Sequence, residues 1–80
     1  MIKVRYFAAA AERAGRPADE FDVDGVVTIA ALRGLLAARH PALAPVLAQS
    51  RLAINLRFAK DSDVVDDGSE VAVIPPVGGG

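Results

Sequence analysis

The sequence predicts an α+β fold in which one main helix covers a mixed β-sheet. Two observations lead to this class. Several short segments, spread along the whole chain, alternate apolar with polar residues, which is typical of strands with one buried face. Only one longer segment, residues 28–40, repeats its apolar residues at the spacing of an amphipathic helix. With 80 residues, the chain is long enough for one small domain.

The first expected elements are a strand and a short helix. Residues 2–7 alternate apolar with basic side chains, which predicts a half-buried strand. The alanine-rich residues 8–14 have a high helix propensity, and Gly15 follows them as a natural C-terminal cap. We therefore expect a short helix directly after the first strand.

A second strand and the main helix come next. Residues 20–24 alternate again and run into the turn-forming pair Asp24-Gly25. Thr28 can cap the N-terminus of a helix that ends before Pro41. The apolar stripe of this helix should cover one face of the sheet. It consists of Ile29, Leu32, Leu35 and Leu36.

The remaining segments complete the sheet. Residues 43–49 can form a short turn of helix, and residues 51–58 alternate as a third strand. After a short apolar pair at residues 64–65, residues 70–75 form the last strand. The first and last strands are both rich in Ile and Val, so we expect them to lie side by side as a parallel central pair. This is the ubiquitin-like β-grasp arrangement.

The composition excludes several classes of function. The net charge is −1 and the basic residues are dispersed, which argues against nucleic acid or an anionic membrane as the partner. The chain has no cysteine, which excludes disulfides, thiolate catalysis and iron–sulfur clusters. No segment resembles a signal peptide or is long enough to span a bilayer. We therefore expect a soluble, cytoplasmic protein.

Catalytic and metal-binding signals are weak. The one histidine, His40, precedes Pro41 at a helix end, where we expect a solvated residue rather than a base or a metal ligand. The aspartates of residues 61–67 lack the spacing of a calcium loop, so we expect no metal site. No phosphate-binding glycine loop precedes a helix. The chain should therefore bind no cofactor, and any ATP must sit on a partner enzyme.

The C-terminus is the most unusual feature, because three consecutive glycines follow an apolar strand and a double proline. Glycine has no side chain, so such a segment can thread a narrow channel and present an unhindered carboxylate. We expect residues 1–76 to form the domain and residues 77–80 to form a flexible tail. Four residues reach at most about 14 Å, which is enough to enter a buried site.

Two stretches resemble the small subunits of molybdopterin synthase, a family of ubiquitin-like sulfur carriers. The opening IKVRYFA, residues 2–8, is followed by a helix with Glu12 and Gly15, as in that family. Residues 67–80, DGSEVAVIPPVGGG, are similar to the family's ending, which reads D-G-(D/S)-E-V-A, two hydrophobic residues, P-P-V, one variable residue and G-G. Gly78 occupies the variable position, where a side chain is commoner. With the intervening helix and the strand Ala53-Ile54-Asn55, the resemblance covers essentially the whole chain.

The resemblance implies a function for the terminal glycine. In such proteins an E1-like enzyme adenylates the C-terminal carboxylate with ATP, and a sulfur donor protein converts the product to a thiocarboxylate. The large subunit of the synthase then uses that sulfur to build the dithiolene of molybdopterin. Carried onto this chain, the reactive carboxylate is that of Gly80, and Gly78 and Gly79 are the bare backbone that threads the partner. The chain would then be a sulfur-donating subunit without catalytic activity of its own.

A docking surface is expected near the root of the tail. Phe7 and Ile74 fall out of phase with the buried residues of their strands, and Phe58 closes the third strand, although Phe58 could equally belong to the core. A domain this small cannot bury every large apolar side chain, and contiguous exposed apolar area marks interaction sites. The residues expected to contact the partner are Phe7, Phe58, Ile74, Pro75, Pro76 and Val77.

Other functions stay open on the sequence alone. The sulfur carrier of thiamine biosynthesis shares the fold and the Gly-Gly end, although it commonly lacks the Pro-Pro-Val approach. A carrier for tRNA thiolation or protein modification belongs to the same class. In a different class, the β-grasp domain could be a binding module with an idle tail. Loss or survival of activity after deletion of Gly80 separates the carriers from the binding module.

Overall fold

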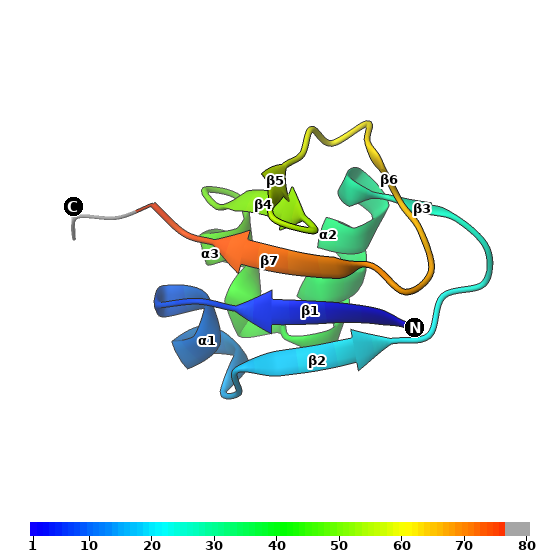
Figure 1. The fold of residues 1–80 in the computed structure, drawn as a ribbon. Helices are drawn as coiled ribbons and strands as arrows, with labels where there is room; N and C mark the ends of the chain where they lie inside the picture. The colour runs from blue at the N-terminus through cyan, green and yellow to red at the C-terminus, as the bar shows by residue number, and fades with distance from the viewer. Residues whose placement is uncertain (77–80) are drawn as a thin grey trace.

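The structure is a computed structural model that describes residues 1–76. Within these residues, a five-stranded sheet forms one layer and the helices form the other (Figure 1). The sheet has the order β2-β1-β7-β4-β5, and its strands are β1 (Ile2–Tyr6), β2 (Ala18–Phe21), β4 (Arg51–Ile54), β5 (Arg57–Phe58) and β7 (Glu70–Ile74). A separate antiparallel ribbon consists of β3 (Val27–Thr28) and β6 (Val64–Val65). The helices are α1 (Ala9–Ala14), α2 (Ile29–Arg39) and α3 (Ala44–Leu47), with the 3₁₀ turn η1 (Pro41–Leu43) before α3.

Strands β1 and β7, the first and the last, lie side by side as a parallel pair at the centre of the sheet. Val4 stands opposite Val71, and Tyr6 stands opposite Val73. β2 and β4 flank this pair in antiparallel orientation. The α+β fold, the mixed sheet and the parallel central pair, all predicted from the sequence, are confirmed.

The hydrophobic core lies between the sheet and α2. From the helix, Ile29, Leu32 and Leu36 are fully buried against the inward residues of the central strands. Leu35, which the sequence placed in the same stripe, is 41% exposed. Adjacent helix positions are about 100° apart around the axis, so the face that buries Leu36 turns Leu35 toward its edge. The buried stripe is therefore narrower than predicted.

Both predicted helix caps are present. Gly15 ends α1 in the left-handed conformation, with φ 74°, and its N–H donates to the carbonyl of Ala11. Thr28 begins α2, and its Oγ1 accepts a hydrogen bond of 3.1 Å from the N–H of Ala31. These local signals decide where α1 ends and where α2 begins.

The second strand differs from its prediction. β2 covers Ala18–Phe21 instead of residues 20–24. Its pairing with β1 sets this register, with Asp19 opposite Val4. As a result, Asp19 faces inward and is buried. The strand pairing, which is invisible in local alternation, decides the boundaries here.

The third predicted strand, residues 51–58, is a hairpin formed by β4 and β5. Asn55 and Leu56 reverse the chain with φ angles of 47° and 74°, both in the left-handed region. Neither glycine nor proline marks this turn, so the continuous alternation of apolar residues concealed it. The correction matters because it carries Leu56 out of the sheet to the tip of the hairpin.

Residues 77–80, predicted to be a flexible tail, lie outside the described residues, and the boundary between domain and tail stays a prediction. Within residues 1–76, no helix is long and apolar enough to cross a membrane.

Candidate functional site

The structure describes the chain up to the double proline, so Gly80 and the other residues of 77–80 lie outside it. β7 ends at Ile74, after which Pro75 is buried and Pro76 is exposed. The burial of Pro75 leaves little of its ring for a partner, in contrast with Pro76. Both prolines line a hollow at α1 and α3, whose other residues include Ala9, Val46 and Gln49.

The face of the sheet that α2 does not cover is the open face. Strand register places two rows of residues across it. The first row runs through Arg5, Ala72, Ala53 and Phe58, on β1, β7, β4 and β5 in turn. The second row, nearer the end of β7, contains Ile74 opposite Arg51. The two alanines are the smallest side chains of the first row, so the surface dips at its centre.

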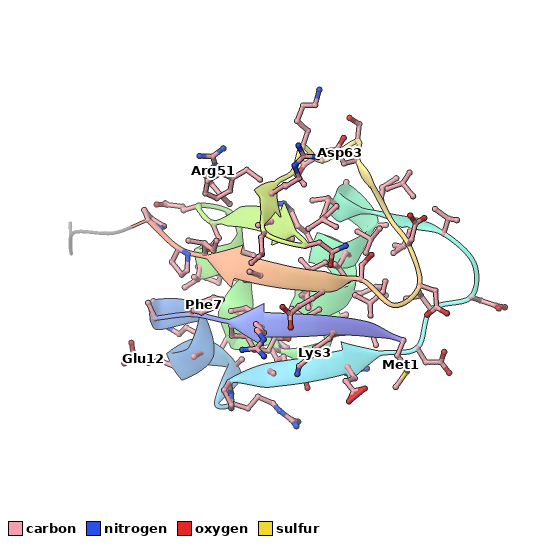
Figure 2. The ribbon with its side chains drawn as sticks, in the orientation of Figure 1. Met1, Lys3, Phe7, Glu12, Arg51 and Asp63 are labelled. Carbon is pink, nitrogen blue, oxygen red and sulfur yellow. The ribbon has the colours of Figure 1, made fainter. Side chains whose placement is uncertain are left out.

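Around these alanines lies an apolar hollow of about 200 Å³. It is lined by Phe7, Ala53, Leu56, Phe58, Ala72 and Ile74. Phe7 is 46% exposed and Phe58 is 56% exposed, so neither belongs to the core. The structure thus brings Phe7, Phe58 and Ile74 together on one surface at the C-terminal end of β7. Figure 2 shows Phe7 and Arg51 at this same end of the sheet.

Sequence reasoning missed Leu56, which is 93% exposed at the tip of the β4–β5 hairpin. The available signal was Asn55, because asparagine is among the few non-glycine residues that tolerate the left-handed region. The regular alternation of residues 51–58 predicted one continuous strand in spite of Asn55.

Two arginines border the apolar hollow. The guanidinium of Arg51 stacks on the Phe58 ring, with 3.7 Å between its central carbon and the ring centroid. Arg5 is held by Glu70, since its Nε donates to Oε2 at 2.8 Å. The hollow is therefore an apolar depression with cations at its rim.

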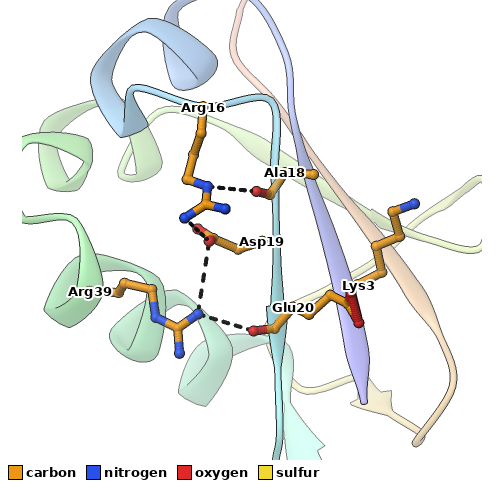
Figure 3. Close-up of a pocket in the computed structure, with 6 residues that line it drawn as sticks. All are labelled: Lys3, Arg16, Ala18, Asp19, Glu20 and Arg39. Atoms are coloured by element: carbon orange, nitrogen blue, oxygen red, sulfur yellow. Dashed lines mark hydrogen bonds and ion pairs between the residues drawn. The ribbon is translucent and has the colours of Figure 1, made fainter.

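Apart from the apolar hollow, a polar cluster surrounds the buried Asp19, on the side of the sheet that faces the helices. The Tyr6 hydroxyl donates to Asp19 Oδ2 at 2.8 Å, and His40 Nε2 lies 2.6 Å from the same oxygen. Arg16 and Arg39 lie near Oδ1 at 3.3 Å and 3.9 Å (Figure 3). The cluster joins β1, β2 and the end of α2 around one carboxylate.

The environment of Asp19 shifts two pKa values. Burial raises the pKa of the Asp19 carboxyl, but the hydrogen bonds from His40 and Tyr6 and the charge of Arg16 outweigh burial and hold that pKa below its usual range. Burial and the bond to Asp19 raise the pKa of the Tyr6 phenol. The carboxylate is thus charged, paired and largely shielded, which suits a structural role.

The sequence-based interpretation of His40 was wrong. Its side chain is only 17% exposed and bonds to Asp19 instead of lying in solvent. The physical reason is the earlier start of β2, which brings a carboxylate under the end of α2. Among residues 1–76, no group of three or more His, Asp or Glu side chains lies in position to hold a metal ion.

Comparison with known protein sequences shows which family the chain resembles along its length. The model of the ThiS family matches residues 4–80. The sulfur carrier subunit of molybdopterin synthase from Chlamydomonas reinhardtii is 42% identical, over 99% of this chain and 98% of its own length. The protein of the same name from Escherichia coli is 39% identical over the full length of both chains.

Solved structures agree on the fold. The small archaeal modifier protein SAMP1 from Haloferax volcanii has a TM-score of 0.87 at 31% identity, over 99% of this chain and 98% of its own. A chain from the complex of subunits 1 and 2 of the molybdopterin-converting factor from Helicobacter pylori has a TM-score of 0.72 at 21% identity, over 99% of this chain and 97% of its own length. The ubiquitin-like β-grasp fold is thereby confirmed. By its full-length match and its relatives at up to 42% identity, the chain belongs to the ThiS family of ubiquitin-like sulfur carriers, beside the small subunits of molybdopterin synthase.

Proposed function

We propose that this chain is the sulfur carrier subunit of a molybdopterin synthase. One observation carries the proposal: relatives of that name match the chain along its whole length, and the family match extends through Gly80. The sequence retains the double proline and the glycine end on which the carrier chemistry depends.

The reacting group is the carboxylate of Gly80. A carboxylate is a poor acyl donor until one of its oxygens becomes part of a leaving group. Attack of that oxygen on ATP releases pyrophosphate and gives an acyl-adenylate. Sulfur at the oxidation level of sulfide then displaces AMP and leaves a thiocarboxylate. When this sulfur passes to the dithiolene of molybdopterin, water replaces it on the acyl carbon and the carboxylate is regenerated.

Other proteins supply the rest of the chemistry. An E1-like enzyme binds the ATP, a sulfur donor protein provides the sulfur, and this chain binds no cofactor itself. We place the activity in the cytoplasm, where ATP is available.

The apolar hollow is the docking surface for the large subunit. Phe7, Phe58 and Ile74 offer exposed apolar area at the C-terminal end of β7, from which residues 77–80 continue. Residues 77–80 span at most about 14 Å, so a partner that receives the terminal carboxylate must come close to the end of β7, where Phe7 and Ile74 lie. The complex of the two Helicobacter subunits supports such a partner for a protein of this fold.

Protein modification is the second candidate function. The similarity to small archaeal modifier proteins favours it, since a modifier would join its terminal carboxyl to a lysine instead of carrying sulfur. The two functions share the activation step and differ in the nucleophile that follows.

The decisive experiment incubates the chain with its cognate activating enzyme, ATP and a sulfur source, and analyses the C-terminal peptide by mass spectrometry. The proposal predicts replacement of one terminal oxygen by sulfur at Gly80, and no change in a variant that lacks Gly80. An unchanged peptide with an active enzyme contradicts the proposal. Isopeptide-linked products in cell extract, without any thiocarboxylate, indicate the modifier.

A further inference from the structure

Leu56 combines two unfavourable features in one residue. Its φ angle of 74° lies in the left-handed region, where an L side chain with a Cβ is strained. Its side chain is also 93% exposed, the highest fraction among the large hydrophobic residues of the described chain. The preceding Asn55 has φ 47°, so the turn has the form that an Asn-Gly pair adopts most easily. A glycine at position 56 would therefore suit this turn at least as well as leucine does.

The turn that carries Leu56 is held rigidly. The N–H of Asn55 donates to the Glu70 carbonyl at 2.8 Å, and the N–H of Glu70 donates to Asn55 Oδ1 at 2.9 Å. These bonds fix the turn to β7, the central strand. Because its backbone is fixed beforehand, Leu56 can be bound with a smaller loss of conformational entropy than a residue on a loose loop.

Leu56 also lines the apolar hollow, as does Phe58 two positions later in the chain. Arg51 covers the Phe58 ring, and it forms no ion pair within residues 1–76. The hairpin therefore presents two apolar side chains together with one cation. Its complement on a partner is an apolar pocket with a carboxylate at the rim.

We propose that Leu56 is a specificity-determining docking residue that inserts into an apolar pocket of the protein receiving the C-terminal segment. This proposal rests on the proposed function, in which that protein is the large synthase subunit. The short span of residues 77–80 indicates which protein binds here. Residues 77–80 span at most about 14 Å, so a protein acting on Gly80 must approach the end of β7. The apolar hollow begins there, at Phe7 and Ile74, and extends along the open face to Leu56, whose turn is bonded to Glu70 at the start of β7.

The test compares folding with binding in two variants. Leu56→Gly removes the side chain and the backbone strain together, and Leu56→Asn keeps a side chain that tolerates the left-handed region. Neither change should lower the melting temperature, since Leu56 buries almost nothing in the free chain. Both should weaken binding to the purified cognate large subunit at least about tenfold in calorimetry, mainly through faster dissociation.

The matched control is Val26→Ala. Val26 is 67% exposed and precedes β3, and it does not line the apolar hollow. Its substitution should leave the affinity unchanged.

The outcomes separate this proposal from the proposed function. If the unmodified chain binds the large subunit and both Leu56 variants bind equally well, the role of Leu56 is refuted while the carrier function stands. If both variants lose melting temperature in parallel with affinity, Leu56 is a structural residue and the proposal is again wrong. If the unmodified chain does not bind the large subunit, both proposals fail together.

Discussion

The guanidinium of Arg51 lies over the ring of Phe58, with its central carbon 3.7 Å from the ring centroid, and joins the first residue of β4 to the last residue of β5. The contact holds an exposed aromatic ring in one orientation at the edge of the apolar hollow. A surface fixed in this way loses less conformational entropy on binding than a mobile one.

Removing this cation should have a small effect on stability. Arg51→Gln is expected to lower the free energy of unfolding by about 0.5 to 1 kcal/mol, the range for an exposed cation on an aromatic ring. Urea denaturation of Arg51→Gln, Phe58→Leu and the double variant measures the coupling. Strictly additive effects would show that the contact contributes no energy.

A charge in the apolar hollow should disrupt docking. Phe7→Glu is expected to weaken binding of the large subunit by about 1 kcal/mol or more, because a carboxylate would be desolvated in an apolar contact. Val64→Glu is the matched control, since Val64 is exposed to a similar extent but lies on β6. Equal affinity of the two variants in calorimetry would rule out the hollow as the docking surface.

The buried carboxylate should make the fold sensitive to acid. The pKa of Asp19 is lower in the folded chain than its ordinary value of about 3.9, so its stabilising effect is complete above that pH and is lost as the pH falls below it. Asp19→Asn should lower the free energy of unfolding by about 1 to 3 kcal/mol at pH 7.

Urea denaturation at pH 7 and pH 3 checks the sign of this effect. The difference between Asp19→Asn and the unmodified chain should shrink at the lower pH. Asp24→Asn, at an exposed position, serves as the control. A difference that stays constant or grows toward pH 3 would contradict the assignment.

Arg33 should act as a structural clamp between α2 and the end of α3. Its Nη1 donates to the Leu47 carbonyl at 2.5 Å, and its Nη2 donates to the Ser50 carbonyl at 3.0 Å. Arg33→Ala leaves both carbonyls without this donor and should lower the free energy of unfolding by about 1.5 to 3 kcal/mol. Arg33→Lys, which lacks the planar fork, should recover only part of the loss in chemical denaturation. Full recovery would mean that charge alone matters.

A side chain in the terminal glycine run should block transfer without harming the fold. Gly79→Val is expected to abolish sulfur transfer, because the proposed function has the glycine run thread a narrow channel of the partner, while the core formed by residues 1–76 keeps its melting temperature. Gly34→Ala is the glycine control, since a Cβ at Gly34 meets no atom within 4 Å. A large loss of melting temperature in Gly79→Val would assign the glycine a structural role.

Local sequence pattern predicted much of this fold. Alternation in residues 2–7 and 70–75 identified the two central strands, and their shared Ile and Val content predicted their parallel pairing. Thr28 and Gly15 marked helix ends correctly because capping depends on near neighbours in the chain. These features need little information from the rest of the molecule.

The errors arose where distant residues decide the local structure. Asp19 is buried because the pairing of β2 with β1 sets the register of β2. The buried carboxylate in turn forms a hydrogen bond with His40. The turn at Asn55 and Leu56 is stabilised by bonds to Glu70, fifteen positions from Asn55. Part of the apolar hollow was predictable, because Phe7 and Ile74 are out of phase with the core and Phe58 closes the segment 51–58. The exposure of Leu56 became visible only in the folded hairpin.

The most direct test of the carrier function is a single-turnover transfer. The chain bearing a thiocarboxylate at Gly80 is mixed with the cognate large subunit and its sulfur-free precursor, and the mass of the chain and the dithiolene product are followed together. The account predicts that the chain returns to the carboxylate form as product appears in proportion. Product formation with the chain's sulfur retained, or sulfur loss without product, would contradict it.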